Sequence, residues 1–218
     1  MGECGWSMTR KGLFIVTEGI DGSGKTTQAG LLAEWVFNSH KGVNTILLTH
    51  EPSDTKYTKE IYQRLHSGDP HQTPKERMLE LYVLDREEHV NEVIAPALAK
   101  GQFVICDRYK YSTIAYQSAQ GILTSHAISE NAGFPIPDLV LFFNVNPEAS
   151  VERMKKLGKP VDVFEKIGFL EKVKSQYLKL PQLLPNEKIH SINANQSIEL
   201  VHEDVKKAVK PLIEQWLK

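Results

Sequence analysis

The chain of 218 residues predicts an α/β fold, in which a parallel β-sheet is covered by helices on both faces. Short segments rich in Val, Ile, Leu and Phe recur without clean alternation, which is typical of strands buried on both faces. Segments with helical spacing of apolar residues separate them, and turn-forming residues bound them. The expected strands are residues 13–18, 44–51, 102–108, 138–145 and 188–193.

Three longer segments have the periodicity of amphipathic helices. The apolar face of residues 25–39 consists of Leu31, Leu32, Trp35 and Val36. Residues 73–101 begin with Thr73-Pro74, which is typical of an N-cap and first turn, and end at Gly101. Residues 199–217 close the chain. This alternation of strands and helices predicts right-handed crossovers and a doubly wound sheet.

The composition narrows the class of protein. Hydrophobic residues make up 41%, charged residues 24%, and the formal net charge is −1. No basic field attracts nucleic acid or anionic lipid, so we expect no nucleic-acid partner. No apolar run reaches the roughly 18 residues of a membrane span, so we expect no membrane partner either. We expect residues 1–10 to be a loose, disordered extension and residues 11–218 to form a single domain.

The two cysteines predict neither a disulfide framework nor a metal site. Cys4 lies in the N-terminal extension, and Cys106 lies in a predicted strand, where we expect it to pack as a small apolar side chain. This cysteine usage is typical of a reducing compartment and predicts a cytoplasmic protein.

The segment Gly19–Thr26, GIDGSGKT, matches the phosphate-binding pattern G-x-x-x-x-G-K-[ST] between a predicted strand and helix. Glycines let backbone N–H groups turn inward around phosphates, and the helix N-terminus adds positive potential. The alternative is a glycine-rich turn with a surface lysine. The pattern predicts a P-loop NTPase fold that binds a nucleoside triphosphate with Mg²⁺. The predicted triphosphate-binding residues here are Gly19, Asp21, Gly22, Ser23, Gly24, Lys25, Thr26 and Thr27.

Asp107 and Arg108 follow another apolar strand segment. A carboxylate at such a strand end commonly supports Mg²⁺, so Asp107 and the Thr26 hydroxyl are the predicted metal ligands. Arg108 would place a planar cation beside the transferring phosphates. The alternative is a surface ion pair. The P-loop alone does not define the reaction, but the chain lacks an NKxD guanine motif, which argues against a GTPase.

The wider segment 107–117, DRYKYSTIAYQ, follows D-R-[YHF]-x-x-S-[SN]-x-A-Y-Q except at Thr113. Together with TEGIDGSGKTTQ (17–28) and LYVLDR (81–86), it resembles the thymidylate kinase family, and the resemblance covers residues 12–217. The resemblance implies a five-stranded parallel sheet with a short lid at about 154–167. It also implies a homodimer that phosphorylates dTMP to dTDP with ATP and Mg²⁺ for DNA precursor synthesis.

The resemblance implies an acceptor site for dTMP. Tyr82 would stack on thymine, Arg86 would bind the base edge and Arg108 the phosphate, while Tyr116 would pack against the sugar. Asp21 would lie near the 3′-hydroxyl, and Glu51 would support nearby polar groups. The implied acceptor-binding residues are Asp21, Pro52, Tyr82, Arg86, Arg108, Thr113, Tyr116, Gln117, Asp162, Phe164 and Glu165.

On the donor side, Arg153 and Asn193 would lie near adenine. Catalysis would depend on charge neutralisation rather than covalent chemistry. The implied catalytic residues are Asp21, Lys25, Asp107, Arg108, Lys156 and Lys159.

Three departures from the family pattern bear on this hypothesis. His50 replaces an arginine, the P-loop carries no arginine, and the usual lid arginine positions are Leu157 and Val163. We hypothesise that Lys156 or Lys159 supplies the lid cation instead, although lysine lacks the planar fork of arginine. The alternative is that these lysines form a solvated charge run.

The departures leave two other functions open. One is a kinase for another pyrimidine monophosphate such as dUMP, and the other is a nucleotide-binding protein with little turnover. The retained Lys25, Thr26, Asp107 and Arg108 favour a working enzyme.

Overall fold

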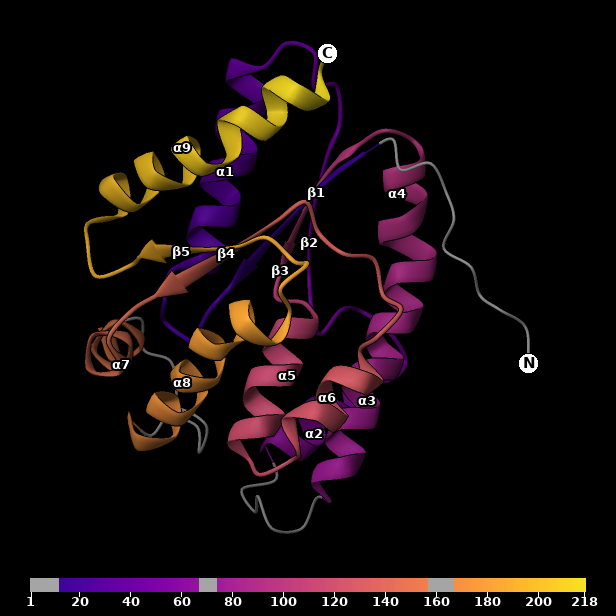
Figure 1. The fold of residues 1–218 in the computed structure, drawn as a ribbon, viewed down its shortest axis with the longest axis vertical. Helices are drawn as coiled ribbons and strands as arrows, with labels where there is room; N and C mark the ends of the chain where they lie inside the picture. Colours follow the sequence, from indigo (N-terminus) through magenta and orange to yellow (C-terminus); the bar gives the residue numbers. More distant parts are fainter. Residues whose placement is uncertain (1–11, 67–73, 157–166) are drawn as a thin grey trace.

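In the computed structural model, residues 12–66, 74–156 and 167–218 are described. They contain a five-stranded parallel sheet of order β2-β3-β1-β4-β5, with helices on both faces (Figure 1). The strands are β1 (Leu13–Glu18), β2 (Ile46–His50), β3 (Phe103–Asp107), β4 (Leu139–Asn144) and β5 (Ile189–Asn193). The helical segments are α1 (Lys25–Ser39), α2 (Thr58–His66), α3 (Lys75–His89), η1 (Val90–Ile94), α4 (Ala95–Ala99), α5 (Lys110–Ala119), α6 (Thr124–Glu130), α7 (Pro147–Lys156), α8 (Ile167–Leu183) and α9 (Ile198–Trp216). The predicted fold class and all the predicted strands are confirmed.

The strand register brings the two predicted phosphate-binding segments together. β1 is the central strand and pairs with β3 on one side, with Thr17 opposite Asp107. The P-loop follows β1, and Arg108 follows β3. Since parallel strands end at the same edge of a sheet, both segments lie at the carboxyl edge, where ligands bind in open α/β sheets.

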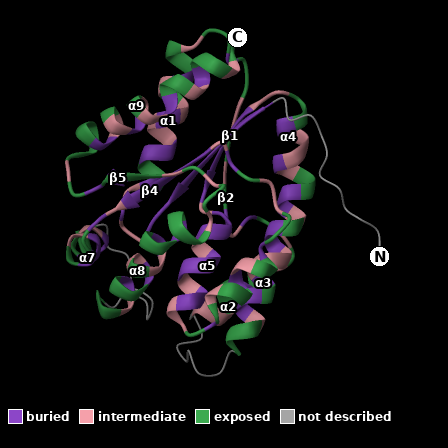
Figure 2. Ribbon diagram, viewed as in Figure 1, coloured by how far each residue is buried: buried purple, intermediate pink, exposed green. Residues whose placement is uncertain are grey.

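Helices cover the two faces of the sheet in separate layers. α1 and α9 pack together over one face, while α3, α5 and α8 lie over the other (Figure 1). The central strands are therefore buried, as Figure 2 shows, and every residue of β1 and β3 is buried. The edge strand β2 is only partly covered.

The helix α1 confirms the predicted periodicity only in part. Leu32 and Val36 are buried, whereas Leu31 and Trp35 are half-buried. The buried stripe is rotated because the first turn of the helix faces inward with the P-loop. The stripe consists of Lys25, Gln28, Ala29, Leu32 and Val36.

The long helix predicted over 73–101 is a continuous helical run of α3, η1 and α4. Thr73 lies outside the described residues, and Pro74 occupies the N-cap position. The run ends as predicted, because Gly101 adopts a φ of 74° just after it. The π turn η1 precedes Pro96, which has no N–H and whose ring would collide with the carbonyl four residues earlier in a regular α-helix. The widened turn relieves this clash.

The helices α2, α5, α6, α7 and α8 were not predicted from periodicity. α5 shows why: most of its residues are buried, including the polar Lys110, Thr113 and Gln117. A helix surrounded by protein has no solvent face, so its polar residues obscure the apolar stripe.

Two sequence expectations fall outside the described residues. Residues 1–10 and most of the expected lid, residues 157–166, are among them. Within the described part of the chain, each helix is either too short or too polar to cross a bilayer.

Burial predicts that alanine substitutions at two neighbouring positions lower the free energy of unfolding by very different amounts. Ile105 on β3 is fully buried, while Leu48 opposite it on the edge strand β2 is 48% exposed. We expect Ile105→Ala to lower the free energy of unfolding by about 2–5 kcal/mol, because it leaves a cavity. We expect Leu48→Ala to lower it by less than about 1 kcal/mol. Urea unfolding of both variants measures the difference, and equal losses would contradict this description of the core.

Candidate active site

The P-loop lies between the end of β1 and the start of α1, as predicted. Gly24 is the N-cap of α1 with a φ of 94°, and Gly22 has a φ of 74°. A Cβ at Gly22 would lie 2.6 Å from the backbone oxygen of Ser150 on α7, so glycine lets α7 approach the loop. The Lys25 ammonium group donates a hydrogen bond to the Ile20 carbonyl at 3.2 Å and therefore folds back over the loop.

Thr26 and Asp107, the two predicted metal ligands, are in contact. The Thr26 hydroxyl donates to one oxygen of the Asp107 carboxylate, and the Thr17 hydroxyl donates to the other at 3.3 Å. A hydroxyl and a carboxylate at the P-loop are the hard oxygen ligands that Mg²⁺ takes. These two side chains therefore fit a magnesium ion.

Arg108 has an unusual backbone conformation, with a φ of 69°. Non-glycine residues rarely adopt positive φ, and such strain persists only where surrounding contacts hold it. The Arg108 N–H donates to the Thr17 carbonyl at 2.9 Å. The guanidinium group is bound by the Asp21 carboxylate and by the Ser112 hydroxyl at 2.9 Å. The turn thus directs the arginine toward the P-loop.

The buried carboxylate of Glu18 holds this turn in place. It accepts hydrogen bonds from the Tyr109 N–H at 2.8 Å, the Ser112 hydroxyl at 2.6 Å and the Tyr177 hydroxyl at 2.8 Å. Burial raises the pKa of Glu18 above its ordinary value, although the hydrogen bond from Ser112 and the charge of Arg108 oppose the shift. Sequence reasoning missed Glu18; an acidic residue ending an apolar strand segment was the available signal.

Asp21 ties the P-loop to the acceptor side. One carboxylate oxygen binds Arg108, and the other accepts a hydrogen bond from the Tyr116 hydroxyl at 2.9 Å. Burial alone would raise the pKa of Asp21, but the charges of Arg108 and Lys25 outweigh it and hold the pKa below its ordinary value. The carboxylate therefore stays ionised at neutral pH.

A cavity of about 350 Å³ opens beside Arg108 and Asp21. Every predicted acceptor residue within the described part of the chain lines it. These residues are Asp21, Pro52, Tyr82, Arg86, Arg108, Thr113, Tyr116 and Gln117. Sequence reasoning missed Tyr62, Leu65 and Met78, which line the same cavity. Asp162, Phe164 and Glu165 lie outside the described residues.

Arg86 forms one wall of this cavity and is only 1% exposed. Its Nε donates to Glu51 at 2.8 Å, one terminal nitrogen donates to Thr113 at 2.9 Å, and the other donates to the Asn131 carbonyl oxygen. Guanidinium carries five N–H groups; these hydrogen bonds use three, and a terminal nitrogen also pairs with the Glu51 carboxylate at 2.8 Å, which leaves no more than two. The held side chain therefore retains donors for a ligand. Asn131 had no signal in the sequence.

A buried cluster behind Arg86 contains potential metal ligands. Atoms of Glu51, His89 and Cys106 lie within 4.8 Å of one another. Each already has a protein partner: Glu51 binds Arg86, His89 Nε2 is 2.8 Å from the Thr49 hydroxyl, and the Cys106 thiol donates to the Arg108 carbonyl. Burial raises the pKa of Cys106, which disfavours the thiolate that a metal needs. We therefore interpret the cluster as residues that hold Arg86 in position. Cys106 packs in its strand as predicted.

The predicted donor-side residues lie together. Arg153 on α7 donates to the Ala194 carbonyl at 2.9 Å, within the loop that follows β5. Asn193 accepts a hydrogen bond from the Asn195 N–H in the same loop at 3.1 Å. Their contact with adenine stays a prediction.

The departures from the family pattern have local explanations only in part. His50 is exposed, and its Nδ1 lies 2.9 Å from the Pro52 carbonyl oxygen. Lys156 is 73% exposed and pairs with Glu152 on α7 at 2.8 Å, as in a solvated charge run. Lys159 lies outside the described residues.

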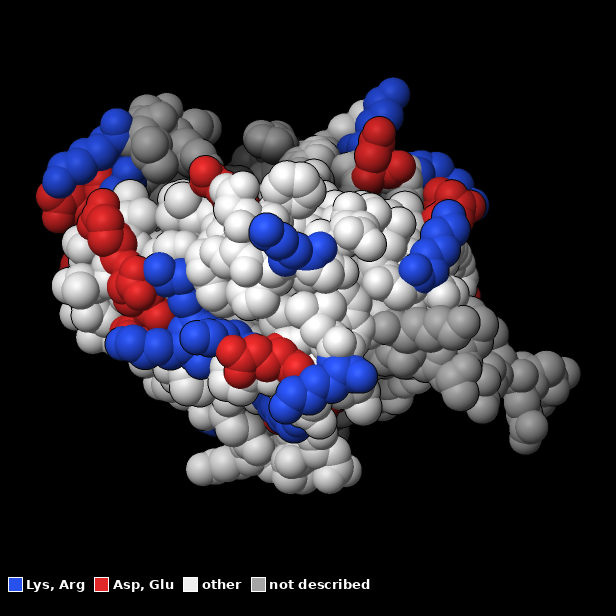
Figure 3. All heavy atoms as spheres, turned by 90° about the horizontal axis from the view of Figure 1, so that it is seen from above, with Lys and Arg blue, Asp and Glu red and all other residues white. Residues whose placement is uncertain are grey.

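One face of the molecule carries charges of both signs. On the face seen in Figure 3, basic and acidic side chains of the described residues interleave rather than forming a patch of one sign. That face therefore offers no field of one sign to an anion, in line with the formal net charge of −1.

The fold and the site define a P-loop nucleotide-binding protein with a cavity beside Arg108. The family model described as "Thymidylate kinase" matches residues 17–205. The chain is 41% identical over 203 residues to the "Probable thymidylate kinase" of Pyrococcus abyssi and 43% identical over 204 residues to that of Pyrococcus horikoshii, covering 92% of this chain and 97% of each relative. It is 37% identical over 205 residues to the "Thymidylate kinase" of Desulfotalea psychrophila, covering 93% of this chain and 96% of that relative. The chain belongs to the thymidylate kinase family.

The lowered pKa of Asp21 predicts a pH dependence of stability. A carboxyl with a depressed folded-state pKa stabilises the fold above its ordinary pKa of 3.8, and the contribution is lost as pH falls below that value toward the folded-state pKa. We expect wild type to lose its advantage over Asp21→Asn across this acidic range. Urea unfolding between pH 3 and 7 measures it, with the exposed Asp54→Asn as control. A difference that stays constant from pH 7 to pH 3 would contradict the ion pair.

Proposed function

We propose that the protein transfers the terminal phosphoryl group of ATP to dTMP, which gives ADP and dTDP, with Mg²⁺ as cofactor. The observation that carries this proposal is the cavity beside Arg108 and Asp21. Every expected acceptor residue that is described lines it, and it lies next to the P-loop. Membership of the thymidylate kinase family supports the same acceptor.

The acceptor is positioned by groups that are already held. Arg86 presents its remaining N–H groups to the edge of thymine, and Tyr82 offers its ring to the face of the base. Arg108 binds the dTMP phosphate, and Asp21 with Tyr116 lies at the sugar. Because Arg86, Arg108, Asp21 and Tyr116 already have protein partners, part of the ordering entropy is lost before the acceptor binds.

The donor lies over the P-loop, with Arg153 and Asn193 near adenine. Lys25 is directed at the terminal phosphates, and the N-terminus of α1 adds positive potential. Thr26 and Asp107 would hold Mg²⁺, which would supply positive charge beside the phosphates. Catalysis follows from holding the two substrates in line between Lys25 and Arg108.

Two further proposals follow from the family membership. We expect the enzyme to be a homodimer that works in the cytoplasm, and sedimentation of the purified chain measures its oligomeric state.

The test of the function is an ADP-release assay with ATP and Mg²⁺ against dTMP, dUMP, UMP, CMP and AMP, with product identity checked. We expect turnover with dTMP, alone or above dUMP, and we expect Lys25→Ala to abolish it. Turnover with another acceptor only would retain the chemistry and overturn the roles of Tyr82, Arg86 and Thr113. If ATP and dTMP raise the melting temperature but no product forms, the chain is a nucleotide-binding protein.

The lid cation is tested by two single substitutions. We expect either Lys159→Ala or Lys156→Ala to lower kcat by at least about tenfold, or roughly 1.4 kcal/mol of transition-state stabilisation, because a cation facing the phosphates is lost. The pairing of Lys156 with Glu152 makes Lys159 the stronger candidate. Lys172→Ala, on the exposed side of α8, serves as control. If both lid variants keep wild-type kcat, neither lysine replaces the missing arginines.

A further inference from the structure

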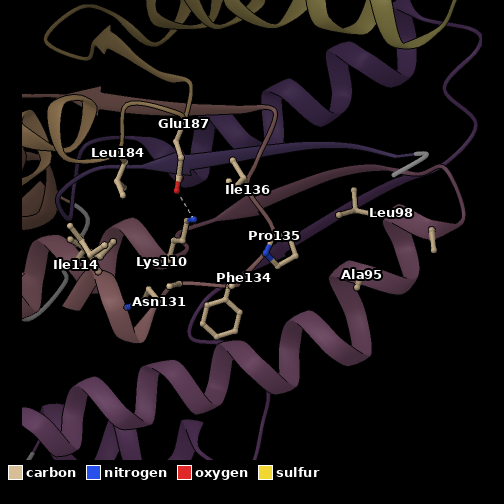
Figure 4. A pocket seen from close by; sticks show the side chains of 14 residues that line it. Ala95, Leu98, Lys110, Ile114, Asn131, Phe134, Pro135, Ile136, Leu184 and Glu187 are labelled. Carbon is tan, nitrogen blue, oxygen red and sulfur yellow. Dashed lines mark hydrogen bonds and ion pairs between the residues drawn. The ribbon is translucent and has the colours of Figure 1, made fainter. Parts of the chain in front are cut away.

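A second cavity lies behind the acceptor site. Its volume is about 530 Å³, against about 350 Å³ for the acceptor cavity. Its walls come from α4, α5, the end of α6, residues 131–136 and the segment between α8 and β5 (Figure 4). We call it the rear cavity. The proposed reaction does not use it.

The rear cavity has the composition of a small-molecule site. Such sites have volumes of about 300–1,000 Å³ and mostly apolar walls with a few polar groups. The apolar side chains include Leu98, Ile114, Ile128, Phe134, Ile136 and Leu184. An uncovered apolar cavity of this size costs solvation free energy, which a ligand would recover.

One polar group in the wall has spare hydrogen-bonding capacity. Lys110 and Glu187 point toward each other in Figure 4, 2.8 Å apart, and their side chains are 6% and 8% exposed. The second oxygen of Glu187 accepts from the Tyr111 hydroxyl. The Lys110 ammonium carries three N–H groups, and within the described residues Glu187 is its one hydrogen-bond partner. Lys110 can therefore donate a hydrogen bond to a ligand oxygen.

The charges favour an uncharged ligand. Lys110 and Glu187 balance each other, so a charged ligand would enter apolar walls without a counter-ion, which is costly. The apolar walls and the spare donors of Lys110 together suit a largely apolar compound with a carbonyl oxygen.

The rear cavity shares a wall with the acceptor cavity. Asn131 and Phe134 line the rear cavity, and both contact Arg86, which lines the acceptor cavity. Asn131 accepts a hydrogen bond from Arg86 and donates to the Ala127 carbonyl at 2.8 Å. The Phe134 ring centroid lies 5.6 Å from the guanidinium carbon. A ligand that fixes Asn131 and Phe134 therefore also fixes Arg86.

We propose that the rear cavity binds an uncharged, largely apolar compound carrying a carbonyl group, and that its occupancy strengthens acceptor binding through Asn131 and Phe134. Two sites that both depend on the position of Arg86 have a coupling free energy, and the coupling is reciprocal. Only this coupling rests on the proposed function, because it takes Arg86 to be an acceptor-binding residue.

The first arm of the test measures occupancy on the full chain with coumarin as the probe, by calorimetry and ligand-observed NMR. Ala95 lines the cavity, and Ala95→Phe fills it; we expect the Kd of coumarin to rise at least about tenfold, or 1.4 kcal/mol. Ala208→Phe is the matched control, since Ala208 is also a half-buried helical alanine but lies on α9. Ala99→Phe replaces Ala95→Phe if that variant does not fold. Indene, which lacks the carbonyl, should bind several-fold more weakly.

The second arm measures coupling. We expect saturating coumarin to lower the Kd of dTMP at least about threefold, and dTMP to lower the Kd of coumarin by the same factor. Asn131→Ala should reduce this factor toward one while coumarin still binds.

Unchanged dTMP affinity, or coumarin binding that Ala95→Phe does not weaken, overturns the proposal. So does a change in oligomeric state in Ala95→Phe without coumarin binding to wild type, which would assign the cavity to a second copy of the chain. If dTMP does not bind at all, the proposed function fails, while the occupancy arm keeps its meaning.

Discussion

The buried carboxylate of Glu18 is the contact on which the geometry of the site depends. A carboxylate inside a protein is costly unless donors surround it. Here the donors come from separate parts of the chain: the start of α5 supplies Tyr109 and Ser112, and α8 supplies Tyr177. One side chain at the end of β1 thus joins the central strand, the turn after β3 and a helix on the sheet face. These hydrogen bonds hold the strained turn at Arg108, whose φ is 69°.

The same arrangement holds the Arg108 side chain in position. Ser112 accepts a hydrogen bond from Arg108 while it donates to Glu18, so the guanidinium is fixed by a residue that is itself fixed. A comparable chain holds Arg86, since Glu51 binds it and His89 lies against Glu51 at 3.3 Å. Arg86 is therefore positioned by buried partners, and Arg108 by half-buried partners, of which Ser112 is itself bound to the buried Glu18. Such support is what lets hydrogen bonds to a ligand be specific rather than merely attractive.

Features that depend on neighbouring residues in the chain could be predicted from the sequence. Contacts between residues far apart in the chain were missed. The strands, the P-loop and the Asp107-Arg108 turn are local patterns, and they were found with nearly correct bounds. The acceptor residues came from the family resemblance, and the described ones do share a cavity. The partners of Arg86 were out of reach because Glu51 and Asn131 lie 35 and 45 residues away along the chain, and no local pattern marks such contacts. α5 was missed because burial on most sides removes the polar face on which periodicity depends.

The charges of the site explain why the lid cation matters in this chain. Among the described residues, Arg108 is paired with Asp21, and Lys25 also lies 3.7 Å from Asp21. Asp107 and the buried Glu18 stand close by. The fixed cations of the site are therefore largely balanced by carboxylates before any phosphate arrives. Phosphoryl transfer places several negative oxygens in the same space, so the additional positive charge has to come from Mg²⁺ and from a further side chain. The P-loop holds no arginine, and the positions at which the family resemblance implies lid arginines are Leu157 and Val163, which is why we propose a lysine of the lid for this role.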